Sequence, residues 1–195
     1  MSDLDGEPED ATSLTPEERE GLIPSHIALR RELNELEQEN ILFATTWAFS
    51  RRRDLFSEAF ARGLHKRMFD RVWDWAGEYR RTDKNIGVPA WRIQTGLRQA
   101  LDDARYWMAN QTFAADEYAL RFHHALVFIH PFPNGNGRWS RLMADLAVTS
   151  IDGQRFSWGA GGDLAQADQT RSAYIQALRA ADGHDFAPLI AFARS

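Results

Sequence analysis

The amino-acid sequence predicts an all-α domain with one short β-hairpin, and three observations support this fold class. Apolar residues recur every three or four positions through most of the 195 residues, which is the spacing of one helix face. Residues typical of helix starts and ends bracket these periodic segments. The period disappears only in residues 78–92, where Gly87 and Pro89 interrupt a polar run. We therefore expect a helical domain in which residues 78–92 form a β-hairpin flap.

Residues 1–23 are expected to form an N-terminal arm that carries one short helix. The beginning of the arm is acidic and contains Gly and Pro, which is typical of a flexible segment. The helix follows, with Thr15 as candidate N-cap, Pro16 at the first helical position and Glu18 completing a capping box. Residues 24–195 are expected to form the main domain.

Seven further helices are expected in the main domain, because the apolar period returns seven times between turn residues. Their expected bounds in chain order are 24–49, 54–75, 95–110, 116–129, 137–151, 164–181 and 186–194. The loop GAGG separates two of them at 159–162. The helix at 116–129 has the clearest stripe, and it ends at His130 because a residue before proline disfavours the helical region.

Composition excludes several classes of protein. A net charge of −5, from 23 Lys+Arg and 28 Asp+Glu, argues against a domain that binds nucleic acid directly. The absence of cysteine excludes disulfides, thiolate zinc sites and thiol catalysis. The acidic N-terminus is unlike a signal peptide, and no apolar run is long enough to span a membrane. We therefore expect a soluble cytoplasmic protein.

The stretch HPFPNGNGRWSR, from His130 to Arg141, carries more chemistry than a turn between two helices requires. Its glycines let backbone N–H groups approach a ligand, and a helix N-terminus follows them, which together form an anion site. Arg138 and Arg141 lie three residues apart and share a helix face. These features predict a cradle for a polyphosphate with two fixed positive charges.

His130 begins this stretch, and its ordinary pKa suits proton abstraction near neutral pH. Asn134 and Asn136 are candidates to orient phosphate oxygens or to complete a metal shell. Each residue alone also fits a structural role, but the joint pattern favours transfer of a phosphate-containing group to a hydroxyl. His123 and His124 lie within a helix, where a packing role is favoured. The P-loop and HExxH patterns are absent.

The stretch matches the signature HPFx[DEN]GNGRxxR, and on this basis the chain resembles the Fic family, also called Fido. Residues 64–80 and 173–192 resemble the family's flap-entry and closing helices, so the resemblance covers residues 36–192. The whole chain is similar to the small bacterial members called mobile mystery protein B.

The resemblance implies a nucleotidyltransferase with ATP as substrate, which moves AMP to a Ser, Thr or Tyr hydroxyl of a target protein. His130 would be the general base. The nucleotide- and phosphate-binding residues would be Lys84, Asn85, Ile86, Gly87, Asn134, Gly135, Asn136, Gly137, Arg138, Arg141, Tyr174 and Asp182.

Within that set, the roles differ. The backbone from Gly135 to Gly137 would form the anion hole, and Arg138 and Arg141 would hold the outer phosphates. The flap residues at 84–87 would pin the target segment and border the nucleotide, while Phe132 would anchor the loop.

Three positions of this chain depart from the family pattern. Asp182, which with Tyr174 matches positions that line the base pocket, replaces a frequent asparagine. Asn134 replaces the Asp or Glu that holds Mg²⁺ in many members, and its neutral oxygen is a weaker ligand for this cofactor. Pro16 replaces the Ser or Thr of the inhibitory pattern [ST]xxxE[GN].

Inhibition of the active site is expected to come from one of three sources. Glu20 ends one partial match to the inhibitory pattern and Glu39 ends another, and either carboxylate would pair with Arg141. The third source is an inhibitory partner chain. Two functional alternatives also stay open: transfer of phosphate or UMP by the same loop, and a silent or partner-regulated subunit of a toxin–antitoxin type pair.

Overall fold

The computed structural model describes residues 14–25, 27, 29–159 and 169–195, and it confirms the all-α fold class. The N-terminal segment expected to be flexible and most of the loop at 159–162 lie outside these residues. The described helices are α1 (Pro16–Glu20), α2 (Arg30–Phe49), α3 (Glu58–Phe69), η1 (Ala90–Arg92), α4 (Ile93–Asn110), α5 (Ala115–Ile129), α6 (Asn136–Thr149), α7 (Gln169–Asp182) and α8 (Ala187–Arg194). None of them is long and apolar enough to cross a bilayer.

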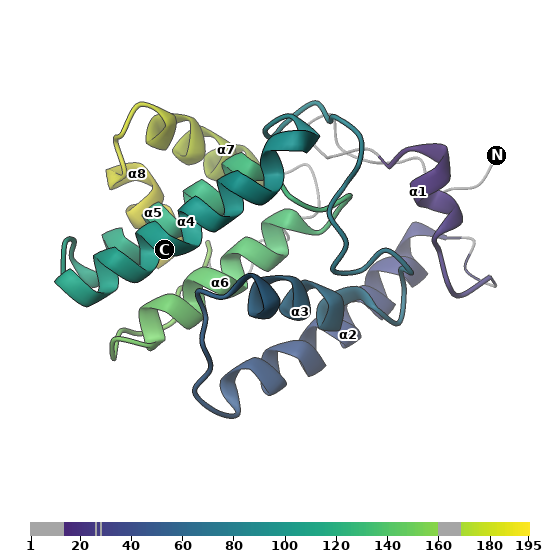
Figure 1. Ribbon diagram of the computed structural model, residues 1–195, viewed down its shortest axis with the longest axis horizontal. Coiled ribbons are helices and arrows are strands. Elements are labelled where there is room, and N and C mark those ends of the chain that lie inside the picture. The colour runs from purple at the N-terminus through teal and green to yellow at the C-terminus, as the bar shows by residue number, and fades with distance from the viewer. Residues whose placement is uncertain (1–13, 26, 28, 160–168) are drawn as a thin grey trace.

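Helix α6 lies at the centre of the fold, between the α2–α3 pair and helix α5 (Figure 1). Helix α4 packs on the other side of α5, and α7 and α8 form a second pair that contacts α5 through α8 and through the α7 side chains Tyr174 and Asp182. The largest buried side chains come from these central helices and their connection, and include Tyr118, Phe122, Phe132 and Trp139. This packing holds both ends of the α5–α6 connection rigidly.

The capping box predicted for the first helix is present. The Thr15 hydroxyl accepts from the Glu18 N–H at 3.3 Å, and the Glu18 carboxylate accepts from the Thr15 N–H at 2.8 Å. Gly21 is the C-cap residue. In Figure 1, α1 lies at the edge of the molecule beside the loop that follows α3.

Helices α2 and α3 are shorter than predicted. Helix α2 begins at Arg30, and α3 ends at Phe69 although the apolar pattern continues to Trp75. Residues 72–74 pair instead with residues 21–23: the Ile23 N–H bonds the Val72 carbonyl and the Asp74 N–H bonds the Gly21 carbonyl, both at 2.9 Å. Backbone groups used in this long-range pairing cannot also serve a helix.

The β-hairpin predicted for residues 78–92 is not formed: the segment is an irregular loop that ends in η1. Its backbone pairs with the end of α5 instead of with itself, through Arg80 N–H to Pro131 carbonyl at 3.0 Å and Val88 N–H to Ile129 carbonyl at 3.4 Å. The buried Arg80 guanidinium supplies hydrogen bonds in place of those that paired strands of a hairpin would make. It donates to the carbonyls of Thr82 at 2.8 Å and Val88, and to the His130 carbonyl at 2.7 Å. We call residues 78–89 the flap loop.

Candidate active site

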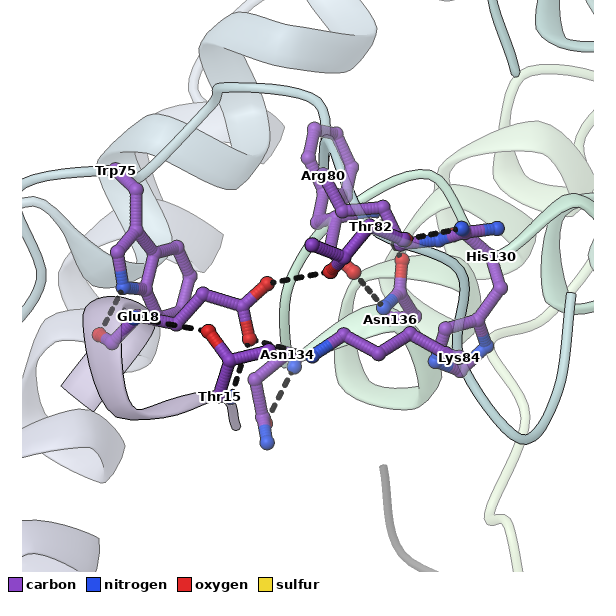
Figure 2. A network of polar contacts seen from close by, with 11 residues as sticks. Thr15, Glu18, Trp75, Arg80, Thr82, Lys84, His130, Asn134 and Asn136 are labelled. Atoms are coloured by element: carbon purple, nitrogen blue, oxygen red, sulfur yellow. Dashed lines mark hydrogen bonds and ion pairs between the residues drawn. The ribbon is translucent and has the colours of Figure 1, made fainter. Parts of the chain in front are cut away.

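The predicted phosphate loop is the connection between α5 and α6, and its two ends adopt left-handed backbone conformations. His130 is the C-cap of α5 with φ 53°, and Gly135 is the N-cap of α6 with φ 77°. Pro131 follows His130 and prevents continuation of α5. Figure 2 shows His130, Asn134 and Asn136 of this loop together with Lys84 of the flap loop and Glu18 of α1.

The side chain of Asn136 braces the loop from inside. Its amide oxygen accepts from the Phe132 N–H at 2.9 Å, and its amide nitrogen donates to the Phe132 carbonyl at 2.8 Å. Both residues are buried. The hypothesis that the Asn136 side chain orients phosphate oxygens is therefore not supported, because its polar atoms serve the loop. Its backbone N–H stays a candidate for the anion hole.

The start of α6 provides backbone donors at the predicted anion hole. Trp139 is the first residue whose N–H bonds within the helix, to the Gly135 carbonyl at 3.0 Å. By helix geometry, the N–H groups of residues 136–138 have no intrahelical acceptor. A Cβ atom added at Gly137 would meet one atom within 4 Å, a nitrogen of Arg141 at 3.5 Å. This turn therefore presents open space, a helix N-terminus and a guanidinium together, as an anion requires.

The two motif arginines have different partners. Arg138 forms an ion pair with the buried Glu37 of α2 at 2.5 Å, and Glu37 also accepts from the Trp73 indole at 2.6 Å. Arg141 lies over the ring of Tyr174, 5.7 Å from its centroid. Burial lowers the pKa of Arg141 and raises the pKa of Tyr174. A bound phosphate would therefore meet a partly neutralised Arg138 and an Arg141 to which no carboxylate of the described residues is bonded.

Tyr174 and Asp182, predicted to line a base pocket, are both engaged with histidines of α5. The buried Tyr174 hydroxyl lies 2.9 Å from Nε2 of His123, and the Asp182 carboxylate lies 2.8 Å from Nε2 of His124. The packing role favoured for His123 and His124 agrees with these contacts. The base-pocket role of Tyr174 and Asp182 stays a prediction.

His130 is a buried histidine kept neutral by its surroundings. Burial lowers the pKa of its ring to about 4, and the positive charges of Arg80 and Lys84 lower it further than the nearby Val127 backbone raises it. The flap loop closes over it: a Cβ atom at Gly87, where φ is 99°, would lie 2.6 Å from Cβ of His130. Asn85 and Ile86 are exposed at the outer side of this loop. At neutral pH the ring is therefore in the unprotonated form that a general base needs.

The ion pair predicted between Arg141 and Glu20 or Glu39 is not formed. Glu20 and Glu39 are both exposed on their helices. The acidic residue of α1 that faces the site is Glu18, whose carboxylate pairs with Lys84 and accepts from the Thr82 hydroxyl at 3.4 Å (Figure 2). The Glu18 carbonyl also accepts from the Trp75 indole at 2.9 Å. Helix geometry explains the error, since Glu20 lies two residues from Glu18 and points to a different side of α1.

Replacing Glu18 with Gln is expected to loosen α1 from the flap loop. Gln keeps an oxygen for the Thr15 N–H but loses the charge that binds Lys84, and hydrogen bonds to charged groups contribute about 1.5–3 kcal/mol. Amide hydrogen exchange in residues 16–20 and 80–88 should rise roughly tenfold or more. Glu20→Gln is the matched control and should leave these rates unchanged. Equal effects of the two substitutions would contradict a specific role for Glu18.

The residues of the loop do not fit a Mg²⁺ site made by protein ligands alone. The Asn134 side-chain oxygen already accepts from the Gly135 N–H at 2.6 Å. Among the described residues there is no group of three or more His, Cys, Asp or Glu that could hold a metal ion. A hard dication requires several oxygen ligands, and a neutral amide is a weak one.

We therefore expect the chain without nucleotide to bind Mg²⁺ only at concentrations on the order of 1 mM or above. Asn134→Asp adds a carboxylate at the same place and should tighten the affinity by roughly tenfold. Isothermal calorimetry of both forms measures this difference, with Asn85→Asp as a control for added surface charge. Identical titrations of wild type and Asn134→Asp would show that position 134 does not contact the ion.

A model of the Fic/DOC family matches residues 55–148, which include α3, the flap loop and the whole phosphate loop. The matched region, just under half of the chain, is therefore similar to the Fic/DOC family. It is 29% identical over 133 residues to a protein adenylyltransferase Fic of Drosophila grimshawi. That alignment covers 66% of this chain and 26% of the relative, so the chain spans about a quarter of the length of the curated relative.

Solved Fic-domain structures have the same fold. The BepC protein of Bartonella tribocorum with bound AMPPNP has a TM-score of 0.64 at 17% identity, covering 92% of this chain and 97% of that one. The N-terminal Fic domain of a Bartonella quintana effector with bound ADP has a TM-score of 0.64 at 18% identity, over 91% and 94% of the two chains. Fic-1 of C. elegans has a TM-score of 0.66 at 22% identity, over 90% and 51%.

Four residues that contact the site were not selected as functional residues from the sequence: Glu18, Glu37, His65 and Arg80. The partners that tie them to the site lie at least 50 residues away in the chain: Lys84 for Glu18, Arg138 for Glu37, Asn134 for His65 and His130 for Arg80. His65 and Arg80 do lie inside the segment 64–80 that carries the family resemblance, and that segment was the available signal.

Proposed function

We propose that this chain transfers AMP from ATP to a hydroxyl group of a protein, with His130 as general base. The observation that carries the proposal is the open first turn of α6, with Arg138 in that turn, Arg141 in the next turn, and the neutral His130 ring at the other end of the same loop. The match of residues 55–148 to the Fic/DOC family model and the adenylyltransferase name of the Drosophila relative support it. The nucleotides bound in the two Bartonella structures support ATP as the donor.

In this reaction His130 takes the proton of the target hydroxyl, and the oxygen attacks the α-phosphorus. The bond from that phosphorus to the bridging oxygen of the β-phosphate breaks, and pyrophosphate leaves. The proton is then on the imidazole, which returns it to solvent. Negative charge grows on the phosphate oxygens, where the backbone N–H groups of residues 136–138 and the helix dipole stabilise it. The residues present do not hold Mg²⁺ by themselves, and these steps depend only on groups of the chain.

The flap loop fits the role of target holder. It lies directly over His130, as the close approach of Gly87 requires. Asn85 and Ile86 are exposed beside that point. An extended target segment could pair with this backbone and present its hydroxyl to the His130 ring, which is the recognition mode of an exposed strand edge.

A silent or partner-regulated form is the second candidate, because Glu37 occupies Arg138. The Glu37 carboxylate is buried and accepts from both Arg138 and Trp73, so an incoming phosphate must share or displace it. A carboxylate that competes with phosphate lowers nucleotide affinity without changing His130. Glu37→Gln, which keeps the Trp73 bond and removes the charge, separates this state from an active one.

The deciding experiment incubates a cell lysate with the purified wild-type chain or with Glu37→Gln. The nucleotide is ATP labelled on the α- or the γ-phosphate, or UTP labelled on the α-phosphate. Protein label from the α-phosphate alone is the expected result. Label from the γ-phosphate alone would replace AMP transfer by phosphate transfer, and label only from α-labelled UTP would replace AMP by UMP. Label that appears only with Glu37→Gln would support the silent form. No label from any nucleotide with either form would overturn the proposed function.

A further inference from the structure

His65 of α3 is a buried histidine that bonds two functional segments at once. Its Nδ1 accepts from the Gly77 N–H at 3.0 Å, and its Nε2 lies 3.0 Å from the Asn134 carbonyl. Because Nδ1 accepts, the ring proton is on Nε2, which donates to that carbonyl. Gly77 leads into the flap loop, and Asn134 lies in the phosphate loop. Both ring nitrogens therefore serve backbone groups of segments that frame His130.

The ring is also fixed by stacking. It lies nearly parallel to Phe132, with centroids 3.7 Å apart and planes 19° apart, and it contacts Phe69 at 4.8 Å. Phe132 is itself clamped by the Asn136 side chain. His65 thus touches the phosphate loop both at the Phe132 ring and at the Asn134 carbonyl.

The Asn134 carbonyl has a direct connection to anion binding. It belongs to the same planar trans peptide as the Gly135 N–H, and the two groups point in opposite directions. While His65 holds the carbonyl on the α3 side, the N–H points to the other side, where it donates to the Asn134 side-chain oxygen at 2.6 Å. A flipped peptide would turn a carbonyl oxygen toward the side where a phosphate must bind. Oxygen dipoles there would repel the anion that the first turn of α6 attracts.

The position of Gly135 also depends on the rings of Phe69 and His65. A Cβ atom at Gly135 would lie 2.5 Å from the Phe69 ring and 3.3 Å from Nε2 of His65. The N-cap of α6 therefore packs against α3, in a left-handed conformation with φ 77°. A change at His65 acts directly on the start of α6.

We propose that His65 is a positioning residue, which holds the Asn134–Gly135 peptide in the orientation that anion binding requires and ties it to the start of the flap loop. The proposal deepens the proposed function and rests on it for the catalytic consequence only. The ring must stay neutral, since a doubly protonated ring would face the Gly77 N–H with a second donor. Burial lowers its pKa to about 3, the Asn134 carbonyl opposes this, and the Arg138 charge adds to it.

Three substitutions separate the two hydrogen bonds from the packing. His65→Gln can place its amide nitrogen near the position of Nε2, so it keeps the donor to Asn134. His65→Asn can place its oxygen near the position of Nδ1, so it keeps only the acceptor for Gly77. His65→Phe keeps the stack on Phe132 and loses both hydrogen bonds. Each substitution is also combined with Gly63→Ala in a double variant that controls for the stability of α3. Gly63 is suitable because it lies on the same helix and nothing lies within 4 Å of an added Cβ. That substitution should stabilise α3 without touching the loop.

The first measurement is amide exchange of residues 133–138, which needs no activity. We expect at least tenfold faster exchange in the Asn and Phe variants, a change under threefold in the Gln variant, and no restoration by Gly63→Ala. The second measurement is AMPPNP affinity, which should weaken at least tenfold in the same two variants and less than threefold in Gln.

Equal effects of Gln, Asn and Phe, or recovery of all effects by Gly63→Ala, would reduce His65 to a core residue and overturn the proposal. So would unchanged loop exchange in His65→Phe. If the wild-type chain transfers no group, the proposed function fails, but the exchange measurement still decides the role of His65. Transfer with unchanged affinity in all variants would leave the function standing and remove the positioning role.

Discussion

Replacing His130 with Asn is expected to reduce the rate of AMP transfer by about 10²–10⁴-fold, the usual contribution of a general base. Affinity for AMPPNP should change by less than roughly threefold, because the ring acts on the target hydroxyl and the phosphates are bound by α6. Asn is a better replacement than Ala for this position. His130 has φ 53°, and Asn tolerates the left-handed region that Ala disfavours. The loss can then be assigned to chemistry instead of to a strained helix end.

His184 provides a matched control for this substitution. It is also a histidine with positive φ, at 65°, but it is exposed in the turn between α7 and α8. His184→Asn should leave both transfer and AMPPNP affinity unchanged. Transfer by His130→Asn within tenfold of the wild-type rate would exclude His130 as the base.

The pH dependence of the same reaction follows from the environment of His130. An ordinary histidine would lose half of its base form near pH 6.5. Here burial, Arg80 and Lys84 lower the pKa to about 4, so the ring of the free protein stays neutral from pH 7 to pH 5. We expect kcat/KM to show no acid limb near pH 6.5 while the chain stays folded, and such a limb in protein shown by circular dichroism to be folded would contradict this environment.

Local sequence signals predicted the ends of the phosphate loop well. Pro131 stops α5 at the predicted residue, and α6 begins within one residue of its prediction because glycine permits the turn at Gly135. These are short-range effects of backbone geometry. The prediction of a β-hairpin in the flap loop was wrong because long-range contacts decide its conformation. Its turn residues are typical of a hairpin, but the Arg80 guanidinium and the end of α5 bond its backbone groups.

The electrostatics of the site could not be predicted for a similar reason. The motif identified Arg138 as a phosphate ligand, but its partner Glu37 is 101 residues away on another helix. The pattern for inhibition pointed to Glu20, whereas the structure uses Glu18 of the same short helix on Lys84. Which of two nearby carboxylates faces the site depends on how α1 docks, and that docking depends on Trp75 and the pairing of Leu22 with Trp73.

The fold is expected to lose a large part of its stability between pH 7 and pH 5, because it buries three neutral histidines. Burial lowers the pKa values of His65 and His123 to about 3 and of His130 to about 4. In the unfolded chain these rings take up protons near pH 6.5, whereas the folded chain does not until pH 4 or below. The unfolded state therefore binds more protons throughout this window, and the free energy of unfolding falls as pH falls.

The size of the effect follows from linkage. At pH 5 each ring contributes a loss of about 1.36 kcal/mol for each of the 1.5 pH units below 6.5, or roughly 2 kcal/mol. The three together approach ~6 kcal/mol, which is comparable to the whole stability of many domains. Asp145 acts in the opposite direction, because burial raises its pKa and the folded state binds its proton first. Asp145 offsets part of this loss of stability only in the pH range in which its own carboxyl group takes up a proton.

Urea unfolding at pH 7, 6 and 5 measures this slope, and His123→Gln identifies one of its sources. Gln can keep a hydrogen bond near Nε2 for the Tyr174 hydroxyl, but it takes up no proton when the chain unfolds. The variant should be less stable than wild type at pH 7, and it should lose roughly 2 kcal/mol less between pH 7 and pH 5. The two stability curves should therefore converge as pH falls. His184→Asn, which removes an exposed ring, should run parallel to the wild-type curve. Parallel curves for His123→Gln as well would show that the buried rings are not what makes the fold sensitive to acid.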